Sequence, residues 1–272
     1  MPGSSRDAAL VSGLDRLLAE GRGAELSPDP VAFPHRYADP GDAEAAAFLA
    51  ASFAFGSVRQ IGSFARFLEI AGRVNGQVVN VSAVARDAGV ARQTVQDFFQ
   101  ILIDTLMGSW LPAWKLKRAT KQTAHPKFYL FDPGVARHLA GLGHLPVHPE
   151  ERRFLFETYL IHEIRAFLHY RGLDDPLFYF RTHDGIEVDL VLETSGGIVA
   201  IEMKSAERWE RKFGSGLLRF RDIHTDRRVT LLGIYRGKRA AVEDGVRILP
   251  WKEALRLLWD GELLGGTARS RR

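Results

Sequence analysis

The sequence has no cysteine among its 272 residues. Disulfide bonds, a thiolate nucleophile and cysteine-ligated zinc or iron–sulfur sites are therefore excluded. No apolar run approaches the roughly 20 residues that a membrane-spanning helix needs. The N-terminus also lacks the basic-then-apolar pattern of a signal peptide, so we expect a cytoplasmic protein with no membrane partner.

Two motifs are missing as well. The phosphate-binding pattern G-x-x-x-x-G-K-[ST] occurs nowhere, so we expect no ATP site. The nine histidines do not cluster, and the stretch that begins at His162 departs from the zinc-protease pattern H-E-x-x-H. A zinc protease is therefore disfavoured.

The composition that remains is typical of a globular protein, with 46% hydrophobic and 26% charged residues. The length allows one large domain or two small ones, each with an adequate core. The net charge of +4 is compatible with a polyanionic partner but is modest. Its distribution is uneven, since residues 1–62 hold five Lys/Arg and eight Asp/Glu, whereas residues 63–149 hold ten and five.

The most informative stretch is IEVDLVLETSGGIVAIEMK, residues 186–204. Apolar and acidic residues alternate from 187 to 193, which predicts a half-buried strand. Ser195, Gly196 and Gly197 predict a tight turn, and residues 198–201 predict the apolar core of a returning strand.

The length of that turn decides which side chains meet. An even loop, either residues 195–196 or residues 194–197, places Asp189 opposite Glu202. Cross-strand Cβ atoms lie about 4.5–5.5 Å apart, close enough for two carboxylates to share a divalent cation. Lys204 would project from the same face as Glu202. A three-residue loop would turn one carboxylate away.

This arrangement predicts a Mg²⁺- or Mn²⁺-dependent phosphodiesterase centre. Asp189 and Glu202 would bind the metal, and Lys204 would orient the attacking water or neutralise charge on the phosphorane. The alternative is a solvated hairpin whose outer face carries charges. An acid at the end of a buried strand is costly without a partner, which favours the site.

The pattern D-x12-E-x-K resembles the PD-(D/E)xK nuclease signature, with its Pro-Asp half reduced to Glu187-Val188-Asp189. The resemblance implies a restriction-endonuclease-like α/β domain with catalytic residues Asp189, Glu202 and Lys204. It also implies a further catalytic and metal-binding acid on the helix before the hairpin. Glu157 is the best match, and Glu163 is the second.

A wider resemblance covers residues 63–260. The stretches SFARFLEIAGRVNGQVVNVSAVARDAGVARQTVQDFFQILIDTL, HPKFYLFDPGVARHLAG and LFETYLIHEIRAF resemble the C-terminal part of uncharacterised bacterial AAA-type ATPases. This resemblance implies a winged helix followed by a nuclease-like domain. The ATPase module that precedes this region in the family is missing, so we expect no ATP hydrolysis by this chain alone.

Residues 63–140 also predict a winged helix-turn-helix from their own periodicity. In the helix expected over residues 91–107, one face carries Val95, Phe98, Phe99 and Leu102. In a DNA reader, the N-terminal end of that helix contacts base edges. The residues concerned are Arg92, Gln93 and Gln96. Winged helices also bind proteins, and the sequence leaves both kinds of partner open.

The stretch between residues 109 and 127 carries five basic residues and no acid. It predicts a basic wing that contacts DNA phosphates, although cations on a solvated loop also serve solubility. The basic residues are Lys115, Lys117, Arg118, Lys121 and Lys127.

The ends of the chain are less informative. Helices predicted over residues 7–21 and 41–56 flank a proline-rich connector, and this part resembles the opening of a helical bacterial family related to helix-hairpin-helix DNA glycosylases. After Lys204, helices are expected over residues 212–223 and 252–261. Strands are expected over residues 227–235 and 246–251.

We therefore predict an α/β protein with four parts: a short helical appendage (1–62), a winged helix-turn-helix (63–149), a PD-(D/E)xK nuclease-like domain (150–264) and a disordered tail (265–272). The predicted function is a metal-dependent DNA nuclease guided by the winged helix. The alternative is a non-catalytic DNA- or protein-binding module derived from an AAA-type ATPase.

Overall fold

A computed structural model describes residues 58–114, 125–173 and 176–264. The chain divides into two units, Met1–Arg66 and Phe67–Arg272. The predicted helices before residue 57 and the predicted tail at residues 265–272 lie outside the described residues. No helix in the described part is long and apolar enough to cross a bilayer.

Three helices and a hairpin come first. Helix α3 (Val58–Arg73) is followed by α4 (Val81–Ala88) and α5 (Arg92–Asp104), and strands β1 (Gly108–Leu111) and β2 (Lys127–Leu130) pair antiparallel. Gly89 ends α4 with a φ of 66°, a left-handed conformation that glycine adopts without steric cost.

The core of this region is aromatic. Phe99 packs against Phe67 and Phe128 with ring centroids 4.8 and 4.7 Å apart, and Trp110 lies 4.6 Å from Phe99. The buried face of α5 confirms the face expected from the sequence: Val95, Phe98, Phe99 and Leu102.

The rest of the chain forms a mixed sheet with helices. After α6 (Pro133–Leu139) and α7 (Pro149–Tyr170), the strands are β3 (Leu177–Arg181), β4 (Glu187–Thr194), β5 (Gly197–Lys204), β6 (Val229–Tyr235), β7 (Ala241–Glu243) and β8 (Val246–Pro250). The 3-10 helix η3 (Arg211–Gly214) and helix α8 (Ser215–Ile223) connect β5 to β6, and α9 (Trp251–Trp259) follows β8. The expected helices and strands after residue 204 are confirmed.

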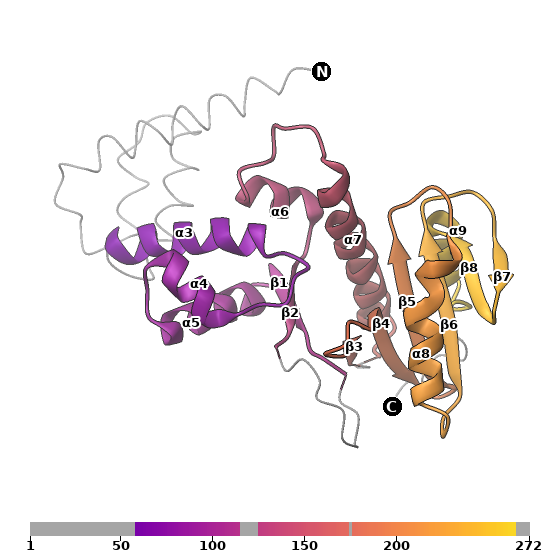
Figure 1. The fold of residues 1–272 in the computed structure, drawn as a ribbon. Helices are drawn as coiled ribbons and strands as arrows, with labels where there is room; N and C mark the ends of the chain where they lie inside the picture. Colours follow the sequence, from indigo (N-terminus) through magenta and orange to yellow (C-terminus); the bar gives the residue numbers. More distant parts are fainter. Residues whose placement is uncertain (1–57, 115–124, 174–175, 265–272) are drawn as a thin grey trace. The chain divides into compact units, whose positions relative to one another are not determined.

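The sheet order is β3-β4-β5-β6-β8-β7. Strands β3, β4 and β5 are antiparallel, whereas β5, β6 and β8 are parallel (Figure 1). The connection through α8 makes the parallel pairing of β5 with β6 possible, because parallel strands require a crossover.

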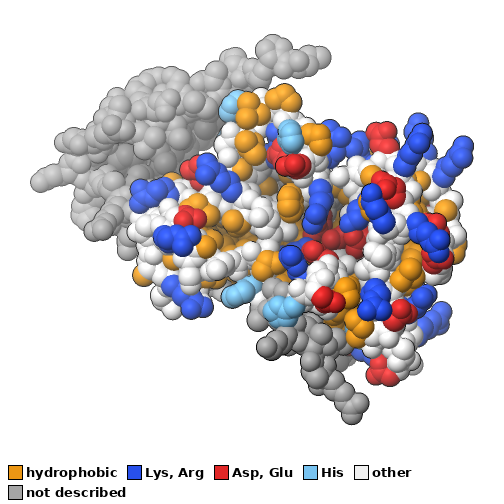
Figure 2. All heavy atoms as spheres, in the orientation of Figure 1, with side chains coloured by type: hydrophobic (Ala, Val, Ile, Leu, Met, Phe, Trp, Pro, Cys, Tyr) orange, Lys and Arg blue, Asp and Glu red, His pale blue; other side chains and the backbone are white. Residues whose placement is uncertain are grey.

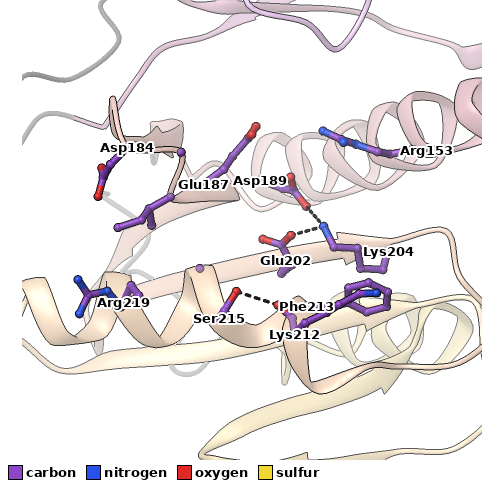
Figure 3. A pocket seen from close by; sticks show the side chains of 13 residues that line it. Arg153, Asp184, Glu187, Asp189, Glu202, Lys204, Lys212, Phe213, Ser215 and Arg219 are labelled. Carbon is purple, nitrogen blue, oxygen red and sulfur yellow. Dashed lines mark hydrogen bonds and ion pairs between the residues drawn. The ribbon is translucent and has the colours of Figure 1, made fainter.

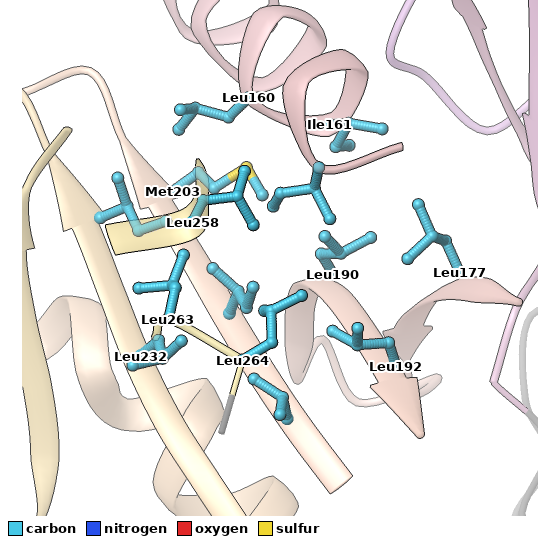
Figure 4. Close-up of a cluster of buried hydrophobic side chains, with 14 of the residues drawn as sticks. Leu160, Ile161, Leu177, Leu190, Leu192, Met203, Leu232, Leu258, Leu263 and Leu264 are labelled. Atoms are coloured by element: carbon cyan, nitrogen blue, oxygen red, sulfur yellow. The ribbon is translucent and has the colours of Figure 1, made fainter. Parts of the chain in front are cut away.

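Helices cover both faces of this sheet. On one face, Leu160, Ile161 and Ile164 of α7 and Leu258 of α9 pack against Leu190 and other strand residues (Figure 4). On the other face, Leu217 and Phe220 of α8 pack against a second cluster of strand residues, including Val188, Val191, Ile198 and Ala200. The prediction of a half-buried strand is therefore wrong, because all of Val188–Leu192 is buried.

A β-bulge interrupts β4 next to Asp189. Phe178 of β3 pairs with Val191, whereas Phe180 pairs with Val188, so β4 holds one residue more than β3 over this interval. Val188 packs in the cluster under α8 while Leu190 packs in the cluster under α7, although a regular strand would place both on one face. Bulges redirect side chains in this way, and here the redirected segment includes Asp189.

The first testable prediction uses the close approach of α8 to β4. A Cβ on Gly216 would overlap the backbone oxygen of Glu187, whereas a Cβ on Gly62 of α3 would meet nothing within 4 Å. Gly216→Ala should lower the free energy of unfolding by about 1–3 kcal/mol through overpacking. Gly62→Ala should leave it equal or raise it by up to about 1 kcal/mol, because alanine is the better helix former. Urea unfolding midpoints measure both, and equal effects would contradict the tight contact.

Candidate functional site

The turn between β4 and β5 has two residues, Ser195 and Gly196, because Thr194 pairs with Gly197. Two residues is one of the two even lengths that place Asp189 opposite Glu202. Gly197 has a φ of 125°, and a Cβ there would overlap the backbone oxygen of Arg228. The positive φ and this close approach both favour glycine at the first position of β5.

This register brings the predicted side chains together. The pairing of β4 with β5 extends from the turn to Leu190 and Ile201. Asp189 and Glu202 are the next residues along the two strands in the same register. Asp189 is 3% exposed and Glu202 is 6% exposed, which excludes the solvated-hairpin alternative. Lys204 forms an ion pair with Glu202, and its Nζ lies 4.0 Å from Asp189 Oδ2 (Figure 3).

Two hydrogen bonds hold the three side chains. Asp189 Oδ2 accepts a hydrogen bond of 2.7 Å from the backbone N–H of Met203. Glu202 Oε1 accepts from Lys204, whereas Glu202 Oε2 is buried and has no hydrogen-bond partner among the described residues. An unsatisfied buried carboxylate oxygen is costly, so this atom is the open acceptor of the site.

Burial and the neighbouring carboxylate of Asp189 raise the pKa of Glu202 well above its usual range, and Lys204 offsets only part of this. Burial would lower the pKa of Lys204, but Asp189 and Glu202 outweigh burial and raise it. Lys204 is therefore a cation. A divalent cation at the open oxygen would favour the ionised form of Glu202.

Asp189 and Glu202 could supply some of the ligands of such an ion, but not all of them. Among residues 58–114, 125–173 and 176–264, no group of three His, Cys, Asp or Glu side chains is arranged to hold a metal. Mg²⁺ commonly uses one or two carboxylates and takes its remaining ligands from water and phosphate oxygens. Asp189 and Glu202 meet that requirement.

The carboxylates face a cavity of ≈ 350 Å³. Three cations from separate elements also line it, namely Arg153 of α7, Lys212 of η3 and Arg219 of α8 (Figure 3). The space-filling view shows acidic side chains at the centre of this face with Lys and Arg side chains around them (Figure 2). Sequence reasoning missed these cations, because no spacing in the sequence links three elements that only the fold assembles.

Glu157, the predicted acid on the preceding helix, lies nearby but is differently engaged. It is 1% exposed, and its Oε1 accepts hydrogen bonds from Lys127 Nζ at 3.0 Å and from Tyr129 Oη. Burial raises the pKa of Glu157, with Lys127 opposing and Asp189 adding to the effect. The described lining of the cavity does not include Glu157. Glu163, the second choice, accepts from Trp259 Nε1 at 3.1 Å.

The position of Lys127 differs from the one predicted for it. It was expected to contact DNA, but it is 2% exposed and forms ion pairs of 3.0 Å with both Glu157 and Glu187. Burial would lower its pKa, but the surrounding carboxylates outweigh burial and raise it. The physical reason is that β2 turns this side chain toward α7 and β4, where the acids lie. The long apolar stem and the charged head are both enclosed.

The other predicted DNA contacts divide into two groups. Arg92, Gln93 and Gln96 are exposed at the start of α5, as a reading helix would require. The remaining basic residues lie outside the described part of the chain: Lys115, Lys117, Arg118 and Lys121.

Comparison with known proteins agrees with part of the resemblance. Residues 153–254 match a domain of unknown function (DUF4143) that is found in AAA-ATPase-associated proteins. Residues 52–145 match a second domain of unknown function (DUF8612). No solved structure matches the chain.

Two curated relatives have the same degree of similarity. Uncharacterized proteins of Mycobacterium tuberculosis and Mycobacterium bovis are each 27% identical over 132 residues, which is 48% of this chain and 29% of each relative. The match therefore spans less than a third of each relative's length.

A second prediction concerns Lys127. Lys127→Met keeps the apolar stem but leaves Glu157 and Glu187 without their cation, and removing one partner of a buried pair costs about 3–5 kcal/mol. Urea unfolding at neutral pH should show a loss of this size. Adding Glu157→Gln should restore part of it, because the amide carries no charge. Full additivity of the two changes would contradict a coupled network.

A third prediction concerns Glu202 and pH. Its raised pKa means that the folded chain binds this proton more tightly than the unfolded chain, so its contribution to stability is full below about pH 4.5 and is lost as pH rises through the folded value. Glu202→Gln cannot ionise and should gain stability relative to wild type as pH increases from 4.5 to 8 with a chelator present. Glu193→Gln, an exposed change on the same hairpin, is the control. A pH-independent difference between Glu202→Gln and wild type would show that Glu202 is not perturbed.

Proposed function

We propose that this chain is a Mg²⁺- or Mn²⁺-dependent DNA nuclease. The observation that carries the proposal is the buried pair Asp189 and Glu202, with an open oxygen on Glu202, beside the cation of Lys204. The charged side chains of Arg153, Lys212 and Arg219 line the same cavity. The described lining holds four cations (Arg153, Lys204, Lys212, Arg219) and four acids (Asp184, Glu187, Asp189, Glu202), so a bound divalent ion would make the cavity positive overall and suit it to an anionic substrate.

Each residue of the site would have its own role in phosphodiester hydrolysis. A bound divalent ion would lower the pKa of a water molecule and offset charge on the scissile phosphate. Asp189, held by the N–H of Met203, and Glu202 would hold that ion. Lys204 would stabilise negative charge that develops on the phosphate, and it would not act as a base because its pKa is raised. Arg153, Lys212 and Arg219 would bind phosphates on either side of the scissile bond.

The fold elements support the same proposal. A long helix carrying a buried acid, followed by a hairpin that presents D-x12-E-x-K on a helix-covered mixed sheet, supports a PD-(D/E)xK nuclease-like domain. Helices α3, α4 and α5 with the hairpin β1–β2 support a winged helix-turn-helix that would hold duplex DNA. The exposed start of α5 would read base edges, and the basic stretch between β1 and β2 would contact phosphates.

A non-catalytic DNA- or protein-binding module is the second candidate. It is favoured by two lysines, the buried Lys127 and the half-buried Lys204, because they already neutralise much of the acidic charge. Metal binding and cleavage distinguish the two candidates.

The fourth prediction is catalytic. Wild type should bind Mn²⁺ in calorimetry and cut plasmid or branched DNA with Mg²⁺ or Mn²⁺ but not with a chelator. Asp189→Asn keeps an acceptor for the N–H of Met203 and should lose metal binding without unfolding. Lys204→Ala should retain Mn²⁺ and lose cleavage by about 10²–10³-fold, the usual effect of removing one charge-stabilising group.

The exposed variant Glu193→Gln should behave as wild type in both assays and is the matched control. If wild type neither binds Mn²⁺ at millimolar concentration nor cuts any DNA form, the nuclease proposal fails and the binding module remains.

A further inference from the structure

A second cavity, which we call the α7 groove, lies outside the carboxylate site. It has a volume of ≈ 660 Å³ and is lined by residues of α7, the hairpin β1–β2 and the end of α5. Most of its wall is apolar. The residues that matter here are Leu106, Phe131, His162, Arg165, His169 and Tyr170.

Arg165 is a half-buried cation. Its Nε is buried and has no hydrogen-bond partner among the described residues, and its Nη2 reaches the backbone oxygen of Trp110 only at 3.4 Å. Within residues 58–114, 125–173 and 176–264, it forms no ion pair. Burial lowers its pKa, and no neighbouring acid opposes that shift.

The comparison with Lys127 shows how unusual this is. Lys127 is fully buried and has two carboxylates at 3.0 Å. A charge that is removed from water normally requires such partners, because its desolvation is otherwise uncompensated. Arg165 is partly removed from water, has no such partner among the described residues, and lines the α7 groove.

A second unfavourable feature lies at the rim. Leu106 is 82% exposed and has a φ of 60°, a conformation that a large side chain rarely adopts. Tyr170 is also 82% exposed, and Phe131 is 36% exposed. Backbone strain and exposed apolar surface both reduce stability, and their coincidence at one rim indicates a binding function.

The lining indicates which ligand fits. No Asp, Glu or Lys is among the described residues of the wall, and Arg165 is its only guanidinium. A nucleic acid presents a row of phosphates and is held by several cations, so it suits this wall poorly. One guanidinium set among apolar side chains suits a single carboxylate, which can accept two parallel hydrogen bonds from it.

We propose that the α7 groove binds a short peptide segment of a partner protein in which an Asp, Glu or C-terminal carboxylate lies beside large apolar side chains. Arg165 receives the carboxylate, and Leu106, Phe131 and Tyr170 cover the apolar side chains. The proposal is independent of the nuclease activity, because none of these residues lines the carboxylate site.

The test begins with a displayed library of random 12-residue peptides. Binders are selected on the full chain and counter-selected on Arg165→Met, which keeps the apolar stem and removes the charge. Enriched sequences are synthesised with a fluorescent label, together with copies in which each acid is replaced by its amide. Fluorescence anisotropy then gives affinities for wild type, Arg165→Met, Leu106→Gly and Arg152→Met. The last removes an exposed arginine from the same helix and is the control.

The expected result is an acidic residue next to large apolar residues in the enriched peptides. Affinity should fall at least about tenfold for Arg165→Met and for the amide peptides, and should be unchanged for Arg152→Met. The melting temperatures of Arg165→Met and Leu106→Gly should equal or exceed that of wild type, since each change removes an unfavourable feature of the free protein.

Several outcomes would overturn the proposal. If no enriched peptide binds wild type more tightly than Arg165→Met, the proposal is wrong. It is also wrong if the acid and amide peptides bind equally well. Lower melting temperatures for both Arg165→Met and Leu106→Gly would show that the two residues stabilise the free protein instead of serving a ligand. Loss of binding to a labelled 12-nucleotide single strand in Arg165→Met would assign the groove to nucleic acid. A wild-type dimer that Arg165→Met dissociates would assign it to a second copy of the chain.

Discussion

The structure depends on a cluster of buried and half-buried charged side chains that partly neutralise one another. Four carboxylates and two ammonium groups come from the long helix α7, strand β2 and the hairpin β4–β5. Because each isolated charge would be costly in this position, the elements that carry them are constrained to stay together. The six residues are Lys127, Glu157, Glu187, Asp189, Glu202 and Lys204.

This constraint joins the hairpin β1–β2 to the sheet. Lys127 begins β2, yet both of its partners belong to the α/β part of the chain. Asn75 adds a second connection, because its side chain donates to Thr158 of α7 and accepts from the backbone of Leu130. Movement of the hairpin would therefore disturb Glu157 and Glu187, which lie beside the carboxylate pair.

The sequence predicted the hairpin well because local rules decide it. Ser195 and Gly196 form the tight turn that their residue types predict, and the turn places Asp189 beside Glu202. The period-2 pattern of β4 was less reliable, because a bulge at Asp189 breaks the alternation and α8 covers the face that was expected to meet water. Bulges and covering helices are tertiary features, and nothing in residues 186–204 encodes them locally.

The charged residues were harder to place than the apolar ones. A lysine in a basic stretch predicts an exposed phosphate contact, but the side chain of Lys127 points inward, where acids more than 25 positions away in the sequence compensate it. Arg153, Lys212 and Arg219 show the opposite case, since the fold gathers cations that no motif connects. Whether a charge is structural or functional therefore depends on its partners. By that criterion, the charge of Lys127 is neutralised within the fold. Glu202 and Arg165 each keep one buried polar atom that has no hydrogen-bond partner among the described residues. Stability alone would favour an apolar residue at both positions, so what retains these two charges has to be sought in what they bind.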